Sequence, residues 1–165
     1  RAFANCYIGN GSFWDIDYFV NYKNTLYAFE VKQKYPTAKG TFGLNVGLTN
    51  LFHFINNSGI KVIHVILTKP VNDYNIPSID FYTKPEYKSK SYWIATKVTD
   101  HLTSVKKSLA PSRTSIYGTY KLGYYDMQPS SFHFIKKASE PNDKLIDFIE
   151  DKTNHLNTLS DLNSF

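Results

Sequence analysis

Hydrophobic and polar positions alternate in two short runs near the start of the chain, Phe13–Asn21 and Leu26–Lys32. Successive side chains of a β-strand point to opposite faces, so an alternation of this kind predicts two half-buried strands. The residues between them, Tyr22–Thr25, are polar and include an Asn, a residue that tolerates the backbone angles of tight turns. We therefore expect a β-hairpin.

The period of two also sorts the side chains of this hairpin by face. In the first strand Asp15, Asp17 and Phe19 share one face, and Ile16, Tyr18 and Val20 share the other. In the second strand Leu26, Ala28, Glu30 and Lys32 share one face, and Tyr27, Phe29 and Val31 share the other. A hairpin with this turn brings Asp17 across from the region of Glu30.

A helix and a buried strand are predicted after the hairpin. In Thr41–Asn57, leucine and isoleucine recur at spacings of four, three and four, and the run ends in Asn-Asn-Ser-Gly, which suits a helix C-terminus. Ile60–Leu67 is a nearly continuous β-branched run, as in a central strand covered on both faces. Strand, helix and strand of these lengths predict a crossover with parallel strands.

The rest of the chain completes the expected fold. The patterns predict a short strand within Ile76–Tyr82, an exposed basic loop up to Lys90, a strand over Ser91–Thr96, a helix over Lys97–Leu109, a strand or ribbon over Arg113–Tyr125, a strand over Phe132–Ile135 and a helix over Asn142–Leu159. The chain of 165 residues fits one domain, residues 1–165. We expect the α/β class, with a mixed central β-sheet flanked by helices.

Composition narrows the classes of function. The net charge of +5 is a mild indication of a polyanionic partner such as nucleic acid. With one cysteine, Cys6, the chain can hold neither an internal disulfide nor a cysteine zinc site. It lacks a phosphate-loop motif and an apolar run long enough to span a bilayer, so we expect no membrane association and a cytoplasmic location.

Two carboxylates and one ammonium group are the candidate chemistry of the hairpin. Glu30 and Lys32 project from the same face, and the turn brings Asp17 toward them. Carboxylate oxygens suit Mg²⁺ or Mn²⁺, and Mg²⁺ keeps positions for water and a substrate phosphate. A lysine beside such an ion can place the attacking water or stabilise charge on the phosphate.

Asp17, a turn and then Glu30-Val31-Lys32 resemble the D…(D/E)xK motif of the PD-(D/E)XK nuclease superfamily. The resemblance covers residues 13–68 and implies a restriction endonuclease-like fold. It implies that Asp17, Glu30 and the Val31 carbonyl bind the metal and that Lys32 is the catalytic lysine. It further implies cleavage to a 5′-phosphate and a 3′-hydroxyl, with DNA rather than RNA as the expected partner and a homodimer as a common arrangement.

The chain departs from the family pattern upstream of the hairpin. Members normally have a helix there that often supplies another Glu, whereas this sequence has no Glu before Glu30. Either that helix lies upstream of Arg1 or the site works without it, and Asp15 could partly substitute as a metal ligand. Three other interpretations stay open. The charges of Asp17, Glu30 and Lys32 can simply pair across the strands, without a metal. The chain can also be a nucleic-acid-binding module that does not cleave, or the nuclease domain of a larger effector.

Basic residues outside the motif are candidates for contact with a nucleic-acid backbone. Lys34 and Lys39 follow the motif directly, and Arg113 and Lys121 belong to the tyrosine-rich ribbon. Each has an ordinary alternative, because lysines also keep loops and edge strands soluble.

Overall fold

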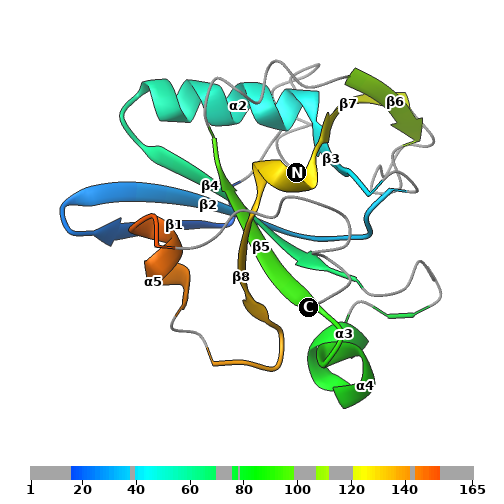
Figure 1. Cartoon of the computed structure of the whole chain (residues 1–165). Coiled ribbons are helices and arrows are strands. Elements are labelled where there is room, and N and C mark those ends of the chain that lie inside the picture. The colour runs from blue at the N-terminus through cyan, green and yellow to red at the C-terminus, as the bar shows by residue number, and fades with distance from the viewer. Residues whose placement is uncertain are drawn as a thin grey trace, which may run out of the picture.

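The structure, a computed structural model, describes residues 16–37, 40–69, 76–77, 79–98, 107–111, 121–141 and 144–152. Its centre is a five-stranded sheet that lies between helix α2 on one face and helix α5 on the other (Figure 1). This arrangement is an α/β fold with a mixed central sheet flanked by helices, as the sequence predicts.

The sheet has the strand order β1-β2-β4-β5-β8. Its strands are β1 (Tyr18–Tyr22), β2 (Thr25–Lys34), β4 (Lys61–Thr68), β5 (Tyr92–Lys97) and β8 (His133–Lys137). Strand β2 pairs with β4 in parallel, and the three other pairs are antiparallel. The sheet is therefore mixed, with its parallel pair next to the hairpin.

The hairpin β1–β2 is confirmed, with one change at its start. Its turn residues Lys23 and Asn24 both have positive φ values, 48° and 60°, which fits a two-residue turn that follows the twist of the strands. Tyr22 pairs with Thr25 at the closed end. The first strand begins at Tyr18, later than predicted, and residues 13–15 lie outside the described residues.

The crossover from β2 to β4 is also confirmed, but its helix is shorter than predicted. Helix α2 spans Val46–Asn57, and the Asn45 side chain caps it by accepting from the N–H groups of Gly47 and Leu48. Gly59 follows the helix with a φ of 86°, a conformation that favours glycine. The prediction of helix from Thr41 was wrong because Phe42–Asn45 form strand β3.

Strand β3 belongs to a second sheet that the sequence did not predict. This sheet has the order β3-β7-β6, where β6 is Lys107–Pro111 and β7 is Lys121–Met127. The predicted helix over Lys97–Leu109 was wrong at both ends, because Lys97 ends β5 and Lys107–Leu109 lie in β6, and residues 99–106 lie outside the described residues. The apolar spacing there is compatible with either structure, and pairing with β7 selects the strand.

Two short helices replace the predicted strand and loop before β5. Helix α3 (Asp80–Thr83) lies where a strand was expected, and α4 (Pro85–Lys88) lies in the expected loop. The predicted strands over Ser91–Thr96 and Phe132–Ile135 are confirmed as β5 and β8. Helix α5 (Lys144–Ile149) is followed by a turn at Glu150 and Asp151, in which Asp151 has a φ of 60°, and residues 153–159 of the predicted helix lie outside the described residues.

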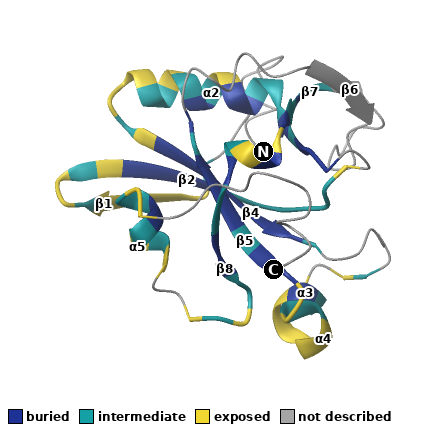
Figure 2. Cartoon of the chain, in the orientation of Figure 1, coloured by how far each residue is buried: buried dark blue, intermediate teal, exposed yellow. Residues whose placement is uncertain are grey.

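Two apolar clusters hold the sheet between its helices (Figure 2). The cluster under α2 includes Phe42, Leu48, Phe52, Val62, Ile66 and Ile94, all buried. The cluster under α5 includes Tyr27, Phe29, Ile63, Val65, Ala95 and Phe148. Strand β1, in contrast, is mostly exposed on both faces at the edge of the sheet (Figure 2).

Candidate functional site

Asp17 lies at the edge of β2, level with Glu30. Its backbone N–H donates to the Phe29 carbonyl at 3.1 Å, and its Oδ2 accepts from the Val31 N–H at 2.7 Å. Asp17 thus bonds to the residues on either side of Glu30, at the point where β1 begins. These two bonds hold the Asp17 backbone and one of its carboxylate oxygens against β2.

The Val31 carbonyl is directed to the same edge. In a strand, the N–H and C=O groups of one residue point to the same side, and the Val31 N–H points to Asp17. Strand β1 starts at Tyr18 and gives Val31 no ladder partner. The expected carbonyl ligand therefore lies on the side of Asp17.

Glu30 and Lys32 form a close ion pair on the face covered by α2. The Glu30 side chain is 1 % exposed, and its Oε1 contacts the Lys32 ammonium. The Lys32 side chain is 37 % exposed, so the lysine reaches the glutamate from the surface. Burying a carboxylate is costly unless a cation compensates it, and here Lys32 supplies that charge.

Lys34 is the next residue on this face of β2, and it is directed inward. Its ammonium donates to the Gly43 carbonyl of β3. Burial, with a smaller effect of the nearby Lys32 charge, lowers the Lys34 pKa to about 8, and the Glu30 charge opposes this shift. Lys34 thus links β2 to the second sheet, and its head group is taken up by that contact.

His64 is the neighbour of Glu30 on strand β4. The two residues are register partners, and the His64 ring lies 5.8 Å from the Phe52 ring of α2. Burial, together with the positive charges of Lys34 and Lys32, lowers the His64 pKa to about 3. The imidazole is therefore neutral at physiological pH, so it adds no positive charge beside Glu30.

Several predicted site residues cannot be placed beside this group. Asp15, Lys39 and Arg113 lie outside the described residues. Lys121 begins β7 in the second sheet, where it pairs with Pro111. The structure thus brings together Asp17, Glu30, Val31 and Lys32, with Lys34 beside them in the interior.

His64 was not among the residues predicted for this group. A histidine within the β-branched run of β4 was a visible signal, but its position beside Glu30 depends on the parallel register. The sequence alone could not fix that register, since a shift of one residue would have turned the imidazole to the other face.

The Asp17 carboxylate and the Val31 carbonyl lie at the edge of β2, and Glu30 lies at the same level with its carboxylate on the face under α2. Two carboxylates and a carbonyl are hard oxygen ligands, and Mg²⁺ is commonly held by one or two carboxylates with water completing its shell. Within the described ranges, no group of three or more His, Cys, Asp and Glu side chains is close enough to hold a metal.

Comparisons with known proteins return no relative: no protein-family model, no curated protein and no solved structure matches this chain. In the described part of the chain, none of the helices has the length and apolar character needed to cross a bilayer.

Proposed function

We propose that this chain is a metal-dependent nuclease that hydrolyses phosphodiester bonds of nucleic acid. Asp17, Glu30 and the Val31 carbonyl hold Mg²⁺ or Mn²⁺, and Lys32 assists the attacking water. The observation that carries the proposal is the position of Asp17, bonded on both sides of Glu30 where the buried Glu30–Lys32 pair lies. DNA is the proposed partner, in line with the net charge of +5.

The fold around the pair supports the proposal. A hairpin, a helix and a strand parallel to the second hairpin strand follow one another as β1, β2, α2 and β4. This is the order expected of a restriction endonuclease-like core, which we propose as the fold. Strand β3 is an addition between β2 and α2, and it pairs away from the core sheet with β7.

Each side chain has a definite task in the proposed reaction. A bound divalent ion supplies charge stabilisation to the scissile phosphate and lowers the pKa of a bound water. The Val31 N–H keeps Asp17 at the strand edge. Lys32, which pairs with Glu30 here, is 37 % exposed and can turn its ammonium toward a phosphate oxygen or the attacking water.

The test is cleavage of supercoiled plasmid, single-stranded DNA and RNA with Mg²⁺, with Mn²⁺ and with EDTA. We expect cleavage that requires the metal and is lost in Lys32→Ala. Lys61→Ala is the matched control, because Lys61 is an exposed lysine at the start of β4. Cleavage that persists in EDTA or in Lys32→Ala would contradict the proposal.

A second candidate is a nucleic-acid-binding module that does not cleave. The ion pair between Lys32 and Glu30 favours it, because that contact satisfies both charges without a metal. Gel-shift titration separates the two functions. Binding that needs neither metal nor Lys32, with no product in any metal, supports the module.

A further inference from the structure

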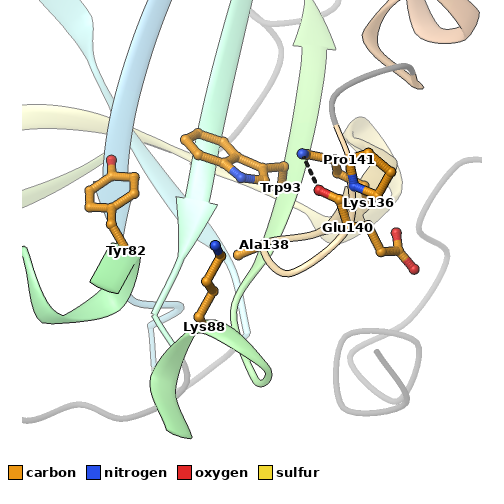
Figure 3. Close-up of a pocket in the computed structure, with 7 residues that line it drawn as sticks. All are labelled: Tyr82, Lys88, Trp93, Lys136, Ala138, Glu140 and Pro141. Carbon is orange, nitrogen blue, oxygen red and sulfur yellow. Dashed lines mark hydrogen bonds between the residues drawn. The ribbon is translucent and has the colours of Figure 1, made fainter. Parts of the chain in front are cut away.

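A cavity of about 380 Å³ lies on the other face of the sheet from Glu30 and Lys32. Its walls include Tyr82 of α3, Lys88 of α4, Trp93 of β5, and Lys136, Ala138 and Glu140 at and after the end of β8 (Figure 3). Cavities that hold small ligands commonly begin at about 300 Å³, so this one is large enough for a single small molecule.

The register of the sheet separates this cavity from the candidate nuclease site. Gln33, Leu67 and Trp93 are partners across β2, β4 and β5, so their side chains share one face. Lys32 precedes Gln33 in the same strand and therefore points to the opposite face. The cavity is thus a separate site from the Glu30–Lys32 pair.

Two aromatic rings form one side of the cavity. The Tyr82 and Trp93 ring centroids are 6.3 Å apart, and the ring planes are inclined by 43° (Figure 3). Tyr82 is 41 % exposed and Trp93 is partly exposed, so both present ring surface to solvent. Exposed aromatic faces of this kind bind planar rings by stacking, as they do with nucleobases.

The cavity also carries positive charge. Lys88 reaches from α4 toward the aromatic rings (Figure 3), and among the described residues its ammonium has no hydrogen bond or ion pair. Lys136 is 7 % exposed and donates to the Glu140 carbonyl at 2.7 Å. Two ammonium groups beside aromatic rings disfavour a cationic ligand and favour an anion.

A bulge in β8 helps to place Lys136 at the cavity. Trp93 pairs with Lys136 while Ile94 pairs with Phe134, so Ile135 has no partner of its own in β5. A bulge of this kind places an extra residue in one strand and re-aims the neighbouring side chains. Ile135 packs into the cluster under α5, and Lys136 still lines the cavity on that face.

Glu140, a carboxylate among the described residues that line the cavity, is directed elsewhere. Glu140 Oε2 accepts from the Lys137 N–H at 3.0 Å and lies 3.5 Å from the Lys144 ammonium. The carboxylate points away from Tyr82 and Lys88 (Figure 3). Its charge is therefore balanced outside the cavity and does not repel an anion bound inside.

We propose that this cavity binds one nucleotide unit, with the base against Trp93 and Tyr82 and the phosphate at the Lys88 ammonium. The unit can be a free mononucleotide or one residue of a nucleic-acid strand, since both present the same base and phosphate. The proposal stands independently of nuclease activity, because no residue of the proposed metal site lines the cavity.

Tryptophan fluorescence tests the proposal directly, because the chain has only Trp14 and Trp93. In a Trp14→Phe background, we expect adenosine 5′-monophosphate to quench Trp93 saturably. Adenosine, without the phosphate, and ribose 5-phosphate, without the base, should each bind about tenfold more weakly. Equal affinity for the nucleotide and ribose 5-phosphate, or no saturable quenching, would overturn the proposal.

Single substitutions test which residue contacts the phosphate and which contacts the base. Lys88→Gln should weaken the mononucleotide about tenfold and leave adenosine unchanged, whereas Tyr82→Ala should weaken both. Lys90→Gln is the matched control, since Lys90 is an exposed lysine two residues away that does not line the cavity. No effect of Lys88→Gln, or an equal effect of Lys90→Gln, would overturn the assignment.

Two further measurements identify the source of the nucleotide and test whether the cavity is independent of the proposed nuclease site. A single-stranded oligodeoxyadenylate that binds at least tenfold tighter than the mononucleotide identifies a strand as the source, and equal affinities identify free nucleotide. Both results support the nucleotide unit. Glu30→Gln should leave the quenching unchanged, and loss of quenching in that variant would show that the cavity is not a separate site.

Discussion

The two faces of the central sheet differ in where they keep their charged groups. On the face under α2, Glu30, Lys34 and His64 lie among apolar side chains in the interior. On the face under α5, Lys136 is buried at the cavity, the cluster around Phe148 is apolar and aromatic, and the ion pairs lie at the border. There Glu150 pairs with Lys23 at 2.6 Å and Asp151 pairs with Lys97 at 2.5 Å.

The difference between the faces is consistent with the proposed site lying on the face under α2. Ion pairs at an exposed border contribute little to stability, and their loss is readily tolerated. Buried charges are costly to keep, and removing one partner leaves the other without compensation. The charges under α2 therefore favour a functional role, whereas the border pairs under α5 serve to fix a short helix and the hairpin turn.

Truncation of one buried ring on each face should give the largest effects. Phe52 and Phe148 are both fully buried, so Phe52→Ala and Phe148→Ala should each lower the free energy of unfolding by about 3–5 kcal/mol. Phe52 packs on His64 beside Glu30, so only Phe52→Ala should also lower cleavage per folded molecule. Urea unfolding and plasmid cleavage measure both. Equal cleavage by the two variants would remove the distinction between the faces.

Replacing an aspartate by asparagine at two positions, one at the proposed site and one on the other face, compares what the two faces contribute to cleavage. Asp17→Asn should lower cleavage at least about 100-fold, because an amide is a poor ligand for the cation. Its oxygen can still accept from the Val31 N–H, so stability should change little. Asp151→Asn on the other face should cleave normally, and Asn suits the φ of 60° at that position. Normal cleavage by Asp17→Asn would contradict the proposed metal site.

Because the Lys34 ammonium is buried, the free energy of unfolding should rise with pH. Its pKa is about 8 in the folded chain and near 10.5 in the unfolded chain, so the unfolded chain binds more protons between these values. Relative to Lys34→Met, the wild type should gain up to about 3 kcal/mol from pH 8 to 10.5, since one pKa unit is worth about 1.4 kcal/mol. Urea unfolding at several pH values measures this difference, and parallel curves for the two proteins would refute it.

The border pair should give the smallest effect. Three hydrogen bonds, from Lys152, Lys23 and the Tyr22 hydroxyl, lower the Glu150 pKa to about 2, below its ordinary value of 4.5. Its contribution is therefore present above pH 4.5 and lost as the pH falls toward 2. Glu150→Gln should lower the thermal midpoint slightly at pH 7, less at pH 3, and leave cleavage unchanged. A larger loss at pH 3 than at pH 7 would show that the sign is wrong.

Local patterns were sufficient where neighbouring segments of the chain pair with each other. The hairpin follows from the alternation around Lys23 and Asn24, and α2 with the parallel strand β4 follows from the apolar spacing after it. Local patterns failed where a partner is remote, as in β3, where Phe42 pairs with Met127. The apolar positions of that segment continue the helical spacing of α2, and a distant strand overrides it.

The sequence by itself determined that Glu30 and Lys32 share a face, because side chains in a strand alternate strictly. It also determined that Asp17 returns to their level, since the turn that joins the strands is short. The tertiary structure alone decided that His64 lies beside Glu30 and that Trp93, Tyr82 and Lys88 enclose a cavity. These arrangements depend on strand register and on how remote elements pack, and both are set by burial of the whole core, which no local segment encodes.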